Sequence, residues 1–376
     1  MAGKKLHIIV ALYKYVFWGG LQKDTLRMAE EAVKRGHKVT VFTTDWENPP
    51  DFITVEKCRV SGWSNVSRMK CFNNAWKERL GQGGFDVSVA MDRVEGADFY
   101  FAADSCLRTY YCKKYPRWYL AISPRHRFIL DMEEKVCGAA SRTRVWYISP
   151  FQREEYIAEY GTPVEHLLEL PPGMNPACVR PAEDVAAKIR NDVRSELGLK
   201  GNELGIILVG TNVKRKGMDR LLDAVKSLPQ EIRNLARPIL VGNIPASEIQ
   251  SFAGDIFDKC IITGPRKDVE RLLLAADIMV HPAREEGTGT VLVEGIASGI
   301  PVLCTACCGF SPYVKVAAGL VVNEPFQQDT LNAMLRTALE NLTQLTEQTR
   351  QYSKTQDFTS RQRVMLDYIE NAASVK

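Results

Sequence analysis

Long hydrophobic runs and a strong charge of one sign are both missing from this 376-residue chain. No apolar run approaches the roughly 18 residues that are needed to cross a bilayer, so we expect no transmembrane helix. The formal net charge is only +4, and this balance alone gives no reason to expect nucleic acid as a partner. The chain contains no internal repeat and no low-complexity segment. Its composition, 45% hydrophobic and 25% charged, is that of a soluble globular protein long enough for two domains.

Three ligand-binding motifs are missing as well. A dinucleotide dehydrogenase needs G-x-G-x-x-G after its first strand, and the turn at Lys14–Gly20 does not fit that pattern. No Asp-x-Asp pair is placed to hold a divalent metal. Ten cysteines are present, but the C-x2-C core of Cys304–Cys308 lacks the second pair that a zinc site requires. We therefore expect free thiols, no metal site and no cofactor.

Apolar runs alternate with helical patterns in both halves, and this alternation predicts an α/β protein with parallel, doubly wound sheets. The run Leu6–Leu12 is too short for a signal peptide and predicts a buried first strand of a cytoplasmic protein. A Pro/Gly break at Leu168–Gly173 predicts a hinge. In the first half we expect a helix over Leu21–Arg35 and strands at Lys38–Thr43, Val87–Met91 and Val145–Ile148. In the second half we expect strands at Gly205–Val209, Pro238–Gly242, Cys260–Thr263, Ile278–His281, Pro301–Cys304 and Gly319–Val322.

Two carboxylates flank a Gly/Thr-rich turn in the stretch Arg284–Gly295. Glu286 precedes the turn, and Glu294 lies one to two turns into the helical pattern that follows it. Free backbone N–H groups and the positive end of a helix dipole bind phosphate at such a turn. Glu294 can then take ribose hydroxyls, while Glu286 faces a sugar beyond the phosphates. The stretch therefore predicts a sugar-nucleotide site.

A basic pair follows the expected strand Gly205–Val209. Gly210 ends this strand, and a loop with Arg215 and Lys216 leads to Gly217 and a new helical pattern. Ligands of open α/β sheets bind at the carboxyl ends of the strands. Two cations at this place can hold a diphosphate and neutralise its charge as it leaves, without a metal ion.

Together these segments resemble the retaining GT-B glycosyltransferases of family 4, and the resemblance narrows to the lipopolysaccharide core glucosyltransferases. It implies two Rossmann-like domains facing across a cleft, residues 1–169 for the acceptor and 170–354 for the sugar nucleotide. A C-terminal helix at about 355–376 would cross back onto the first domain. The matching segments occur in the expected order along nearly the whole chain: Tyr13–Asp24, Tyr100–Asp104, Leu170–Gly173, Arg215–Gly217, His281–Ala283 and Glu286–Glu294.

The resemblance also implies a retaining, metal-independent transfer of a hexose, glucose first of all, from a UDP-sugar to the heptose of the lipopolysaccharide inner core. Front-face attack is the expected chemistry, with the leaving phosphate helping to remove the acceptor proton. The implied catalytic residues are Asp24, Asp104, Arg215, Lys216 and Glu286, of which the two aspartates would lie near the acceptor. The implied donor-binding residues are Gly19, Gly20, Gly210, Arg215, Lys216, Arg266, Glu286, Gly287, Thr288, Gly289, Thr290 and Glu294.

The segment Ser105–Arg127 has six basic residues, no acidic residue and several interleaved Tyr and Trp residues. This combination suits an anionic membrane interface, where a lipid-anchored glycan acceptor would lie. We therefore expect a peripheral protein on the cytoplasmic face of the inner membrane, and a solvated basic helix is the alternative. No nucleic-acid-binding module is recognisable. The expected membrane and acceptor contacts are Lys113, Lys114, Arg117, Trp118, Arg125 and Arg127.

Two other interpretations stay open. The core glucosyltransferases commonly have Phe-Asn-Lys-Met-Pro-Gly where this chain has Ala90–Gly96, with Asp92 and Arg93 in it. This departure favours, as the alternative, a related family 4 transferase that adds another hexose or an N-acetylhexosamine to a different envelope glycan. The non-enzyme alternative is an inactive sugar-nucleotide-binding or membrane scaffold protein. The intact Arg-Lys pair and both glutamates argue against such decay. The sequence fixes neither the nucleobase nor the linkage nor the oligomeric state.

Overall fold

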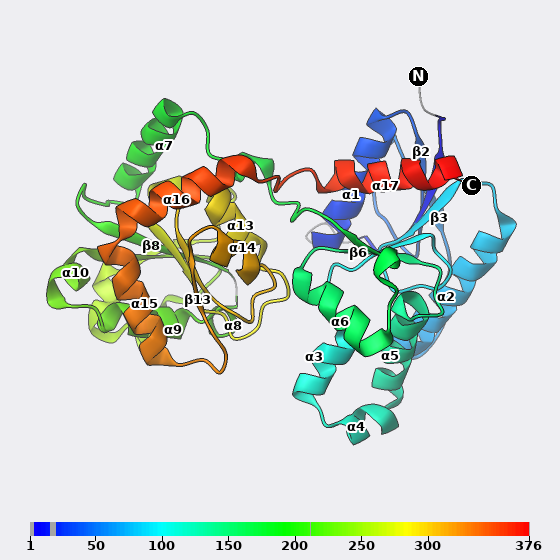
Figure 1. The fold of residues 1–376 in the computed structure, drawn as a ribbon, viewed down its shortest axis with the longest axis horizontal. Coiled ribbons are helices and arrows are strands. Elements are labelled where there is room, and N and C mark those ends of the chain that lie inside the picture. Colours follow the sequence, from blue (N-terminus) through cyan, green and yellow to red (C-terminus); the bar gives the residue numbers. More distant parts are fainter. Residues whose placement is uncertain (1–3, 16–19, 211, 376) are drawn as a thin grey trace. The chain divides into compact units, whose positions relative to one another are not determined.

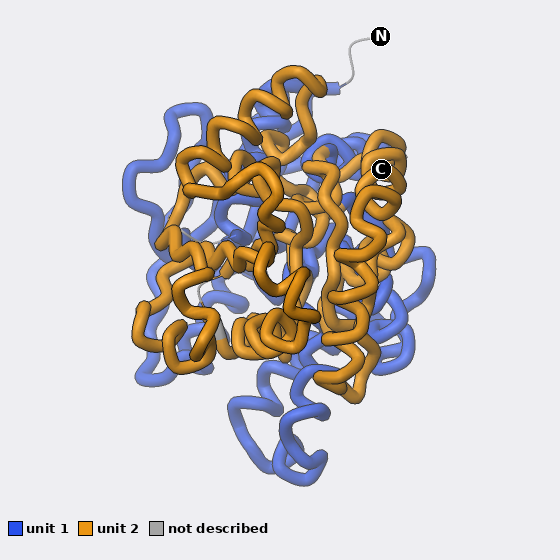
Figure 2. Tube along the Cα trace, turned by 90° about the vertical axis from the view of Figure 1, so that its left-hand side faces the viewer, with its two compact units in different colours: residues 1–171, 360–376 blue, residues 172–359 orange. Residues whose placement is uncertain are grey.

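The computed structural model describes residues 4–15, 20–210 and 212–375, which form two compact units. Unit 1 contains residues 1–171 and 360–376, and unit 2 contains residues 172–359 (Figure 2). The chain therefore leaves unit 1 at the Pro/Gly break and returns to it near its C-terminus. The sequence had placed the first division after residue 169 and the return at about residue 355.

Unit 1 is built on a seven-stranded parallel sheet with the strand order β3-β2-β1-β4-β5-β6-β7 (Figure 1). Parallel strands joined by helices are covered on both faces, which explains why the interior strand β1 is apolar and buried from Ile8 to Ala11. Its strands are β1 (His7–Ala11), β2 (Lys38–Thr43), β3 (Thr54–Lys57), β4 (Val87–Ala90), β5 (Phe99–Phe101), β6 (Arg144–Tyr147) and β7 (Leu167–Glu169). Its helices are α1 (Gly20–Lys34), α2 (Asn65–Gln82), α3 (Leu107–Lys114), α4 (Arg117–Ile122), α5 (Pro124–Cys137), α6 (Pro150–Tyr160) and α17 (Arg361–Val375), with a 3₁₀ turn at Val164–His166.

The last helix, α17, packs against the first helix, α1. Helix α1 buries Thr25, Met28, Ala29 and Ala32, a spacing that lines one face of a helix. An ionic network adds to this packing, because Arg35 Nη1 lies 2.7 Å from Asp367 and 3.2 Å from Glu370. The C-terminal helix is therefore an integral part of unit 1. Phe358, which the sequence had placed in the tail, instead packs beside Tyr313 and Tyr352 within unit 2.

Unit 2 is built on a six-stranded parallel sheet with the strand order β10-β9-β8-β11-β12-β13. Its strands are β8 (Leu204–Val209), β9 (Ala236–Val241), β10 (Ile261–Gly264), β11 (Ile278–His281), β12 (Val302–Thr305) and β13 (Leu320–Val322). Its helices are α7 (Glu183–Glu196), α8 (Val213–Lys216), α9 (Met218–Lys226), α10 (Gln230–Leu235), α11 (Ala246–Ala253), α12 (Val269–Ala275), α13 (Thr290–Ala297), α14 (Ser311–Val316), α15 (Gln328–Glu340) and α16 (Leu342–Thr355), with 3₁₀ turns at Pro176–Cys178 and Gly254–Lys259.

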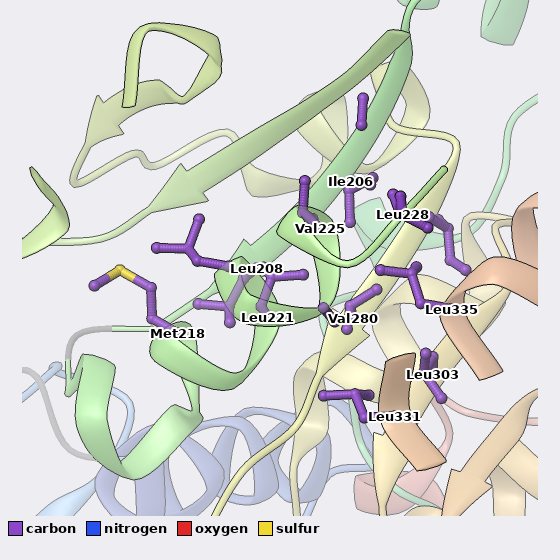
Figure 3. Packing of buried hydrophobic residues seen from close by; sticks show 14 of the residues in the cluster. Ile206, Leu208, Met218, Leu221, Val225, Leu228, Val280, Leu303, Leu331 and Leu335 are labelled. Atoms are coloured by element: carbon purple, nitrogen blue, oxygen red, sulfur yellow. The ribbon is translucent and has the colours of Figure 1, made fainter. Parts of the chain in front are cut away.

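The main core of unit 2 lies between its sheet and the helices α9 and α15. In Figure 3, side chains of β8 such as Leu208 lie beside Leu221 and Val225 of α9, with Leu331 and Leu335 of α15 nearby. All five of these side chains are fully buried. A buried side chain of this size contributes about 1.5–3 kcal/mol when it leaves water, so this core fixes the position of the strand end from which the basic loop begins.

The parallel, doubly wound arrangement that the sequence predicts is confirmed. Two expected strands, Lys38–Thr43 and Ile278–His281, match the structure at both ends, and the other expected strands shift by one or two residues at their ends. The short strands β3, β5 and β7 were not predicted. Strands β3 and β7 are edge strands with mixed burial, so their sequences lack the continuous apolar run that marks the interior strands. Strand β5 is buried, but it has only three residues, Phe99–Phe101. All ten cysteines are free thiols.

Candidate active site

The candidate site of unit 2 lies where the strand order reverses. Strand β8 pairs with β9 on one side and with β11 on the other, and both β8 and β11 end at the same edge of the sheet. Helix α8 follows β8 and ends at Lys216, while β11 ends at His281. Such a switch point is where open parallel sheets bind their ligands.

Three side chains meet at this edge. Lys216 Nζ donates a hydrogen bond to Glu286 Oε2, and the same carboxylate oxygen lies 3.3 Å from His281 Nε2. The side chains of Lys216 and Glu286 are 14% and 11% exposed, and His281 is fully buried. The structure thus brings together two residues from sequence segments 70 positions apart, Lys216 and Glu286, as the sequence analysis expected.

The charge state of this cluster follows from its surroundings. Burial opposes ionisation of Glu286, but hydrogen bonds from His281 and Lys216 outweigh it and lower the pKa of the carboxyl to about 2. Burial also lowers the pKa of His281, although the bond to Glu286 works in the opposite direction. At neutral pH the cluster therefore holds a lysine cation and a carboxylate beside a neutral imidazole. The other ring nitrogen, His281 Nδ1, is buried and has no hydrogen-bond partner among the described residues.

Two glycines make room for this cluster. A Cβ atom on Gly210 would lie 2.9 Å from Cγ of Lys216, so a side chain there would displace the lysine. A Cβ atom on Gly217 would lie 2.0 Å from the carbonyl oxygen of Pro282, and its backbone has a φ of +76°. The loop after β8 therefore passes so close to Pro282 that glycine is required at position 217, directly after the Arg-Lys pair.

The Gly/Thr turn leads directly into α13. Gly289 precedes this helix with a φ of +81°, and as the N-cap residue it has no side chain to cap the first amide groups of the helix. The turn itself is fixed from the other side, because the Phe310 N–H donates to the carbonyl of Thr288 at 2.8 Å. A Cβ atom on Gly309 would lie 2.1 Å from the carbonyl oxygen of Gly287. Uncapped amides on a fixed turn suit a phosphate group, as predicted for Gly287–Thr290.

The two remaining donor candidates in this region lie on either side of the turn. Glu294 is half-buried inside α13. Arg215 is exposed, and its side chain makes no hydrogen bond or ion pair with the part of the chain that the structure describes. Its backbone is held, however, since Arg284 N–H donates to the Arg215 carbonyl at 2.8 Å and Arg284 pairs with Asp219. Arg215 is thus a solvent-facing cation on a loop whose backbone is held in place by a hydrogen bond.

Arg266 departs from the expected role. Its Nε and Nη2 atoms both donate to Asp268 at 2.7 Å, and Nη1 donates to Glu196 at 2.8 Å. A guanidinium held in this bidentate manner has little capacity left for a nucleobase. We therefore leave Arg266 out of the proposed site.

The acceptor candidates of unit 1 differ from each other in environment. The side chain of Asp104 is 76% exposed, its Oδ2 lies 3.8 Å from Arg93 Nη1, and its carbonyl accepts a hydrogen bond from Gln152 at 2.7 Å. It follows β5 by three residues, as the resemblance implies, and its carboxylate faces solvent. Asp104 can therefore meet a substrate.

Asp24 is positioned differently, and the expectation that it touches the acceptor gains no support. Its Oδ2 lies 2.9 Å from Arg361 Nη1, and its Oδ1 accepts from Gln362 at 3.2 Å. Burial raises the pKa of Asp24, while Arg361 opposes this change. Both carboxylate oxygens are used to hold α17 against α1, so we assign Asp24 a structural role. Gly20 begins α1 with open space around it, and Gly19 lies outside the described residues.

The basic segment forms helices α3 and α4 and the first turn of α5. Lys113, Lys114, Arg117, Arg125 and Arg127 are all exposed. Trp118 and Ile122 are 65% and 64% exposed, respectively. A ring cluster joins the three helices, in which Tyr111, Tyr119 and His126 are half-buried and Tyr115 is exposed. The segment therefore presents cations and large apolar side chains together, whereas a purely solvated helix would hide the latter.

Metal-binding clusters and membrane-spanning helices are both absent from the residues that the structure describes. Among residues 4–15, 20–210 and 212–375, no group of three or more His, Cys, Asp or Glu side chains is arranged to hold a metal ion. Over the same residues, no helix has the length and apolarity that a membrane crossing demands.

Sequence reasoning assigned no role to two buried groups, His281 and Glu133. His281 had been noted only as part of a matching segment, although its position at the end of a strand could have identified it as a site residue. Glu133 is fully buried and accepts from the N–H groups of Leu107 and Arg108 at the start of α3. Its Oε1 also lies 3.3 Å from Arg93 Nε. No local pattern reveals this contact, because it joins residues 40 positions apart.

Comparison with known proteins shows which family the chain belongs to. The family description "Glycosyl transferases group 1" matches residues 189–356, and "Glycosyltransferase Family 4" matches residues 18–177. The chain is 31% identical to the lipopolysaccharide glucosyltransferase WaaG of Escherichia coli K12 over 94% of its own length and 96% of that protein. A crystal structure of WaaG, described as a glycosyltransferase involved in lipopolysaccharide biosynthesis, superposes with a TM-score of 0.80 and covers 98% of this chain and 99% of WaaG.

A more distant neighbour extends the comparison of folds. Anabaena Alr3699/HepE, crystallised in complex with UDP-glucose, superposes with a TM-score of 0.67 at 15% identity and covers 97% of this chain and 100% of that one. Similarity at this level of identity supports the fold alone. The long match to WaaG carries the family assignment. The chain is a glycosyltransferase with the GT-B fold, and it belongs to the family of the lipopolysaccharide glucosyltransferase WaaG.

Proposed function

We propose that this protein transfers glucose from UDP-glucose to a heptose of the lipopolysaccharide inner core, with retention of anomeric configuration and without a metal ion. The similarity to WaaG over almost the whole chain supports the sugar and the acceptor. The observation that carries the donor assignment is the Lys216–Glu286–His281 cluster, which lies beside the uncapped start of α13.

Each donor group has a partner of suitable chemistry in this proposal. The amides of Gly287–Thr290 and the start of α13 bind the diphosphate. Lys216 and Arg215 supply positive charge to the β-phosphate. Glu286 accepts hydrogen bonds from hydroxyls of the donor sugar, and Glu294 accepts them from the ribose. Because the pKa of Glu286 is about 2, this carboxylate is ionised and acts as an acceptor throughout the physiological pH range.

The chemical step exchanges one bond at the anomeric carbon. The acceptor hydroxyl oxygen attacks from the face that the phosphate leaves, the bond from the anomeric carbon to the β-phosphate oxygen breaks, and the acceptor proton passes to that leaving oxygen. Negative charge grows on the β-phosphate during this step. Lys216 therefore stabilises the transition state more than the ground state, because Glu286 already holds its ammonium group in position and no reorientation is needed. Asp104 orients the acceptor hydroxyl.

The acceptor is proposed to be anchored in the anionic inner membrane, with the protein bound peripherally to its cytoplasmic face. Exposed cations and the exposed Trp118 on α3 and α4 support this part of the proposal. Basic side chains attract acidic headgroups, and tryptophan favours the boundary between headgroups and acyl chains.

A panel of donors and acceptors tests the proposed function. UDP release would be measured with UDP-glucose, UDP-galactose and UDP-N-acetylglucosamine, each with and without a soluble heptose-containing acceptor. We expect acceptor-dependent release with UDP-glucose above the others. Acceptor-dependent release with UDP-N-acetylglucosamine alone would favour the related transferase. Binding of UDP-sugars without release under any condition would favour a non-catalytic protein.

A further inference from the structure

The buried imidazole of His281 lies at the carboxyl end of β11, where it contacts Glu286. The backbone of His281 pairs with Cys304 of β12, and β11 pairs with β8 on its other side. The His281 side chain has no exposure to solvent. A ring enclosed in a close-packed interior has few alternative rotamers. His281 is therefore a rigid part of unit 2 and is suited to hold a neighbouring group in place.

Glu286 depends on other residues for its position, because it lies on a loop and not on a strand or helix. It follows the last residue of β11 by five positions, and its backbone forms an isolated bridge with Cys308. Two side chains contact its Oε2 atom. Lys216 does so through a long aliphatic chain with several rotatable bonds, whereas His281 does so through a ring, at 3.3 Å. Of these two contacts, His281 supplies the rigid one.

The hydrogen bond between His281 and Glu286 has only one possible direction. Because the pKa of Glu286 is about 2, its carboxylate is ionised at neutral pH and can only accept. Nε2 of His281 therefore carries a proton and donates it. Burial lowers the pKa of His281, so the ring is neutral and Nδ1 carries no proton. A neutral ring holds the carboxylate without placing a second cation beside Lys216.

The other oxygen of Glu286 is left for a ligand. Both side-chain contacts use Oε2, and Oε1 accepts no hydrogen bond from the part of the chain that the structure describes. A carboxylate that is anchored through one oxygen presents the other in a fixed direction, where a sugar hydroxyl can donate to it. Precision of this kind matters, because a misplacement of about 1 Å can reduce turnover about 10²-fold.

We propose that His281 is a positioning residue of the transferase, whose Nε2–H fixes the carboxylate of Glu286 so that Oε1 meets a hydroxyl of the donor sugar. The inference rests on the proposed function, since it takes Glu286 as the contact of the donor sugar. His281 itself need not touch the substrate. It governs recognition of the sugar part of the donor, while the nucleotide part is bound independently of it.

Two amide substitutions distinguish the two ring nitrogens. In His281→Gln the side-chain NH2 reaches the place of Nε2 and can still donate to Glu286, whereas in His281→Asn it reaches only the place of Nδ1. His281→Asn should lower kcat/KM for UDP-glucose roughly 10–100-fold, the effect of losing a hydrogen bond to a charged group. His281→Gln should recover most of this loss. The inhibition constant of UDP, which lacks the sugar, should stay unchanged in both variants.

The matched control is Thr305, at the end of the neighbouring strand β12. Thr305 is fully buried, and its Oγ1 donates to the Ala283 carbonyl at 2.7 Å. Thr305→Val removes this bond and should lower the thermal midpoint, but it keeps the side-chain contacts of Glu286, so kcat/KM for UDP-glucose should not change. Wild-type kcat/KM in folded His281→Asn would overturn the inference. A His281→Gln protein no better than His281→Asn, or an equal loss of UDP affinity, would overturn it as well.

A binding measurement separates this inference from the proposed reaction. Should the wild-type protein transfer no glucose to any acceptor, calorimetry would compare the dissociation constants of UDP-glucose and UDP in wild type, His281→Asn and His281→Gln. Weaker binding of UDP-glucose alone in His281→Asn, restored in His281→Gln, would support the positioning role although the proposed reaction was wrong. Equal effects on the two ligands, no effect on either, or no binding of UDP-glucose to wild type would refute the positioning role.

Discussion

Replacing Lys216 by methionine should abolish most of the turnover and also weaken unit 2. Methionine keeps an aliphatic chain of similar length in the space beside Gly210 but removes the positive charge that faces Glu286. Without this charge, the growing charge on the β-phosphate loses one preorganised partner. By analogy with the removal of one oxyanion donor, we expect kcat to fall roughly 10²–10³-fold.

The stability effect can be estimated from the pKa of Glu286. A folded-state pKa of about 2 against an ordinary value of 4.5 corresponds to about 3 kcal/mol of stabilisation, shared between Lys216 and His281. Because the pKa is depressed in the folded protein, this stabilisation is fully present above about pH 4.5 and is lost as the pH falls toward 2. Lys216→Met should therefore lose at most about 3 kcal/mol at pH 7, and its difference from wild type should shrink under acid conditions.

Two assays and two further variants complete this prediction. Turnover would be followed by UDP release with saturating UDP-glucose, and stability by urea unfolding at pH 7 and at pH 3.5. Lys216→Arg keeps the charge and should retain more activity than Lys216→Met. In the double variant with Glu286→Gln, the stability losses should be less than additive, because the two side chains contact each other. A folded Lys216→Met protein with kcat within threefold of wild type would refute the catalytic role of Lys216.

Three further predictions follow from the proposed site and surface. Glu294→Gln should raise the KM for UDP-glucose roughly 10–100-fold with little change in kcat, because ribose contacts are similar in the ground and transition states. Steady-state kinetics would measure both constants, and an effect confined to kcat would contradict ribose binding by Glu294. Transfer should persist in excess EDTA, and a loss that Mg²⁺ or Mn²⁺ restores would contradict the metal-independent mechanism. Replacing Lys113, Lys114 and Arg117 together by Gln should reduce the affinity for vesicles that contain anionic lipid by one to two orders of magnitude, at about 1 kcal/mol per basic residue. Vesicle sedimentation would measure this affinity, and the affinity for UDP-glucose should not change. Unaltered sedimentation of the folded variant would favour the solvated helix.

The sequence predicted the architecture well because most of its interior strands are short, largely apolar runs bounded by turn residues. Strand β1 and the strand Ile278–His281 needed no tertiary information for their identification. The edge strands β3 and β7 were missed because their residues alternate little and are only partly buried. Their pairing depends on the neighbouring strand, which no local pattern specifies.

The expected site residues differ in the surroundings that the fold gives them. Lys216 and Glu286 occur in motifs whose glycines are required by close backbone approaches, so the sequence itself marks them. Asp24 and Arg266 are charged residues beside expected binding loops, but the fold supplies each of them with an internal ionic partner. Arg361 and Glu196 lie far from Asp24 and Arg266 in the sequence, whereas Asp268 lies only two residues from Arg266.

The stereochemistry of the transfer product tests the central claim most directly. UDP-glucose labelled with ¹³C at the anomeric carbon would be incubated with a soluble heptose-containing acceptor and the wild-type protein, and the product would be observed by NMR without prior purification. The account predicts a new α-linked glucosyl heptoside that accumulates in step with UDP. A β-linked product would contradict retention, and free glucose without any glycosyl heptoside would contradict transfer to this acceptor.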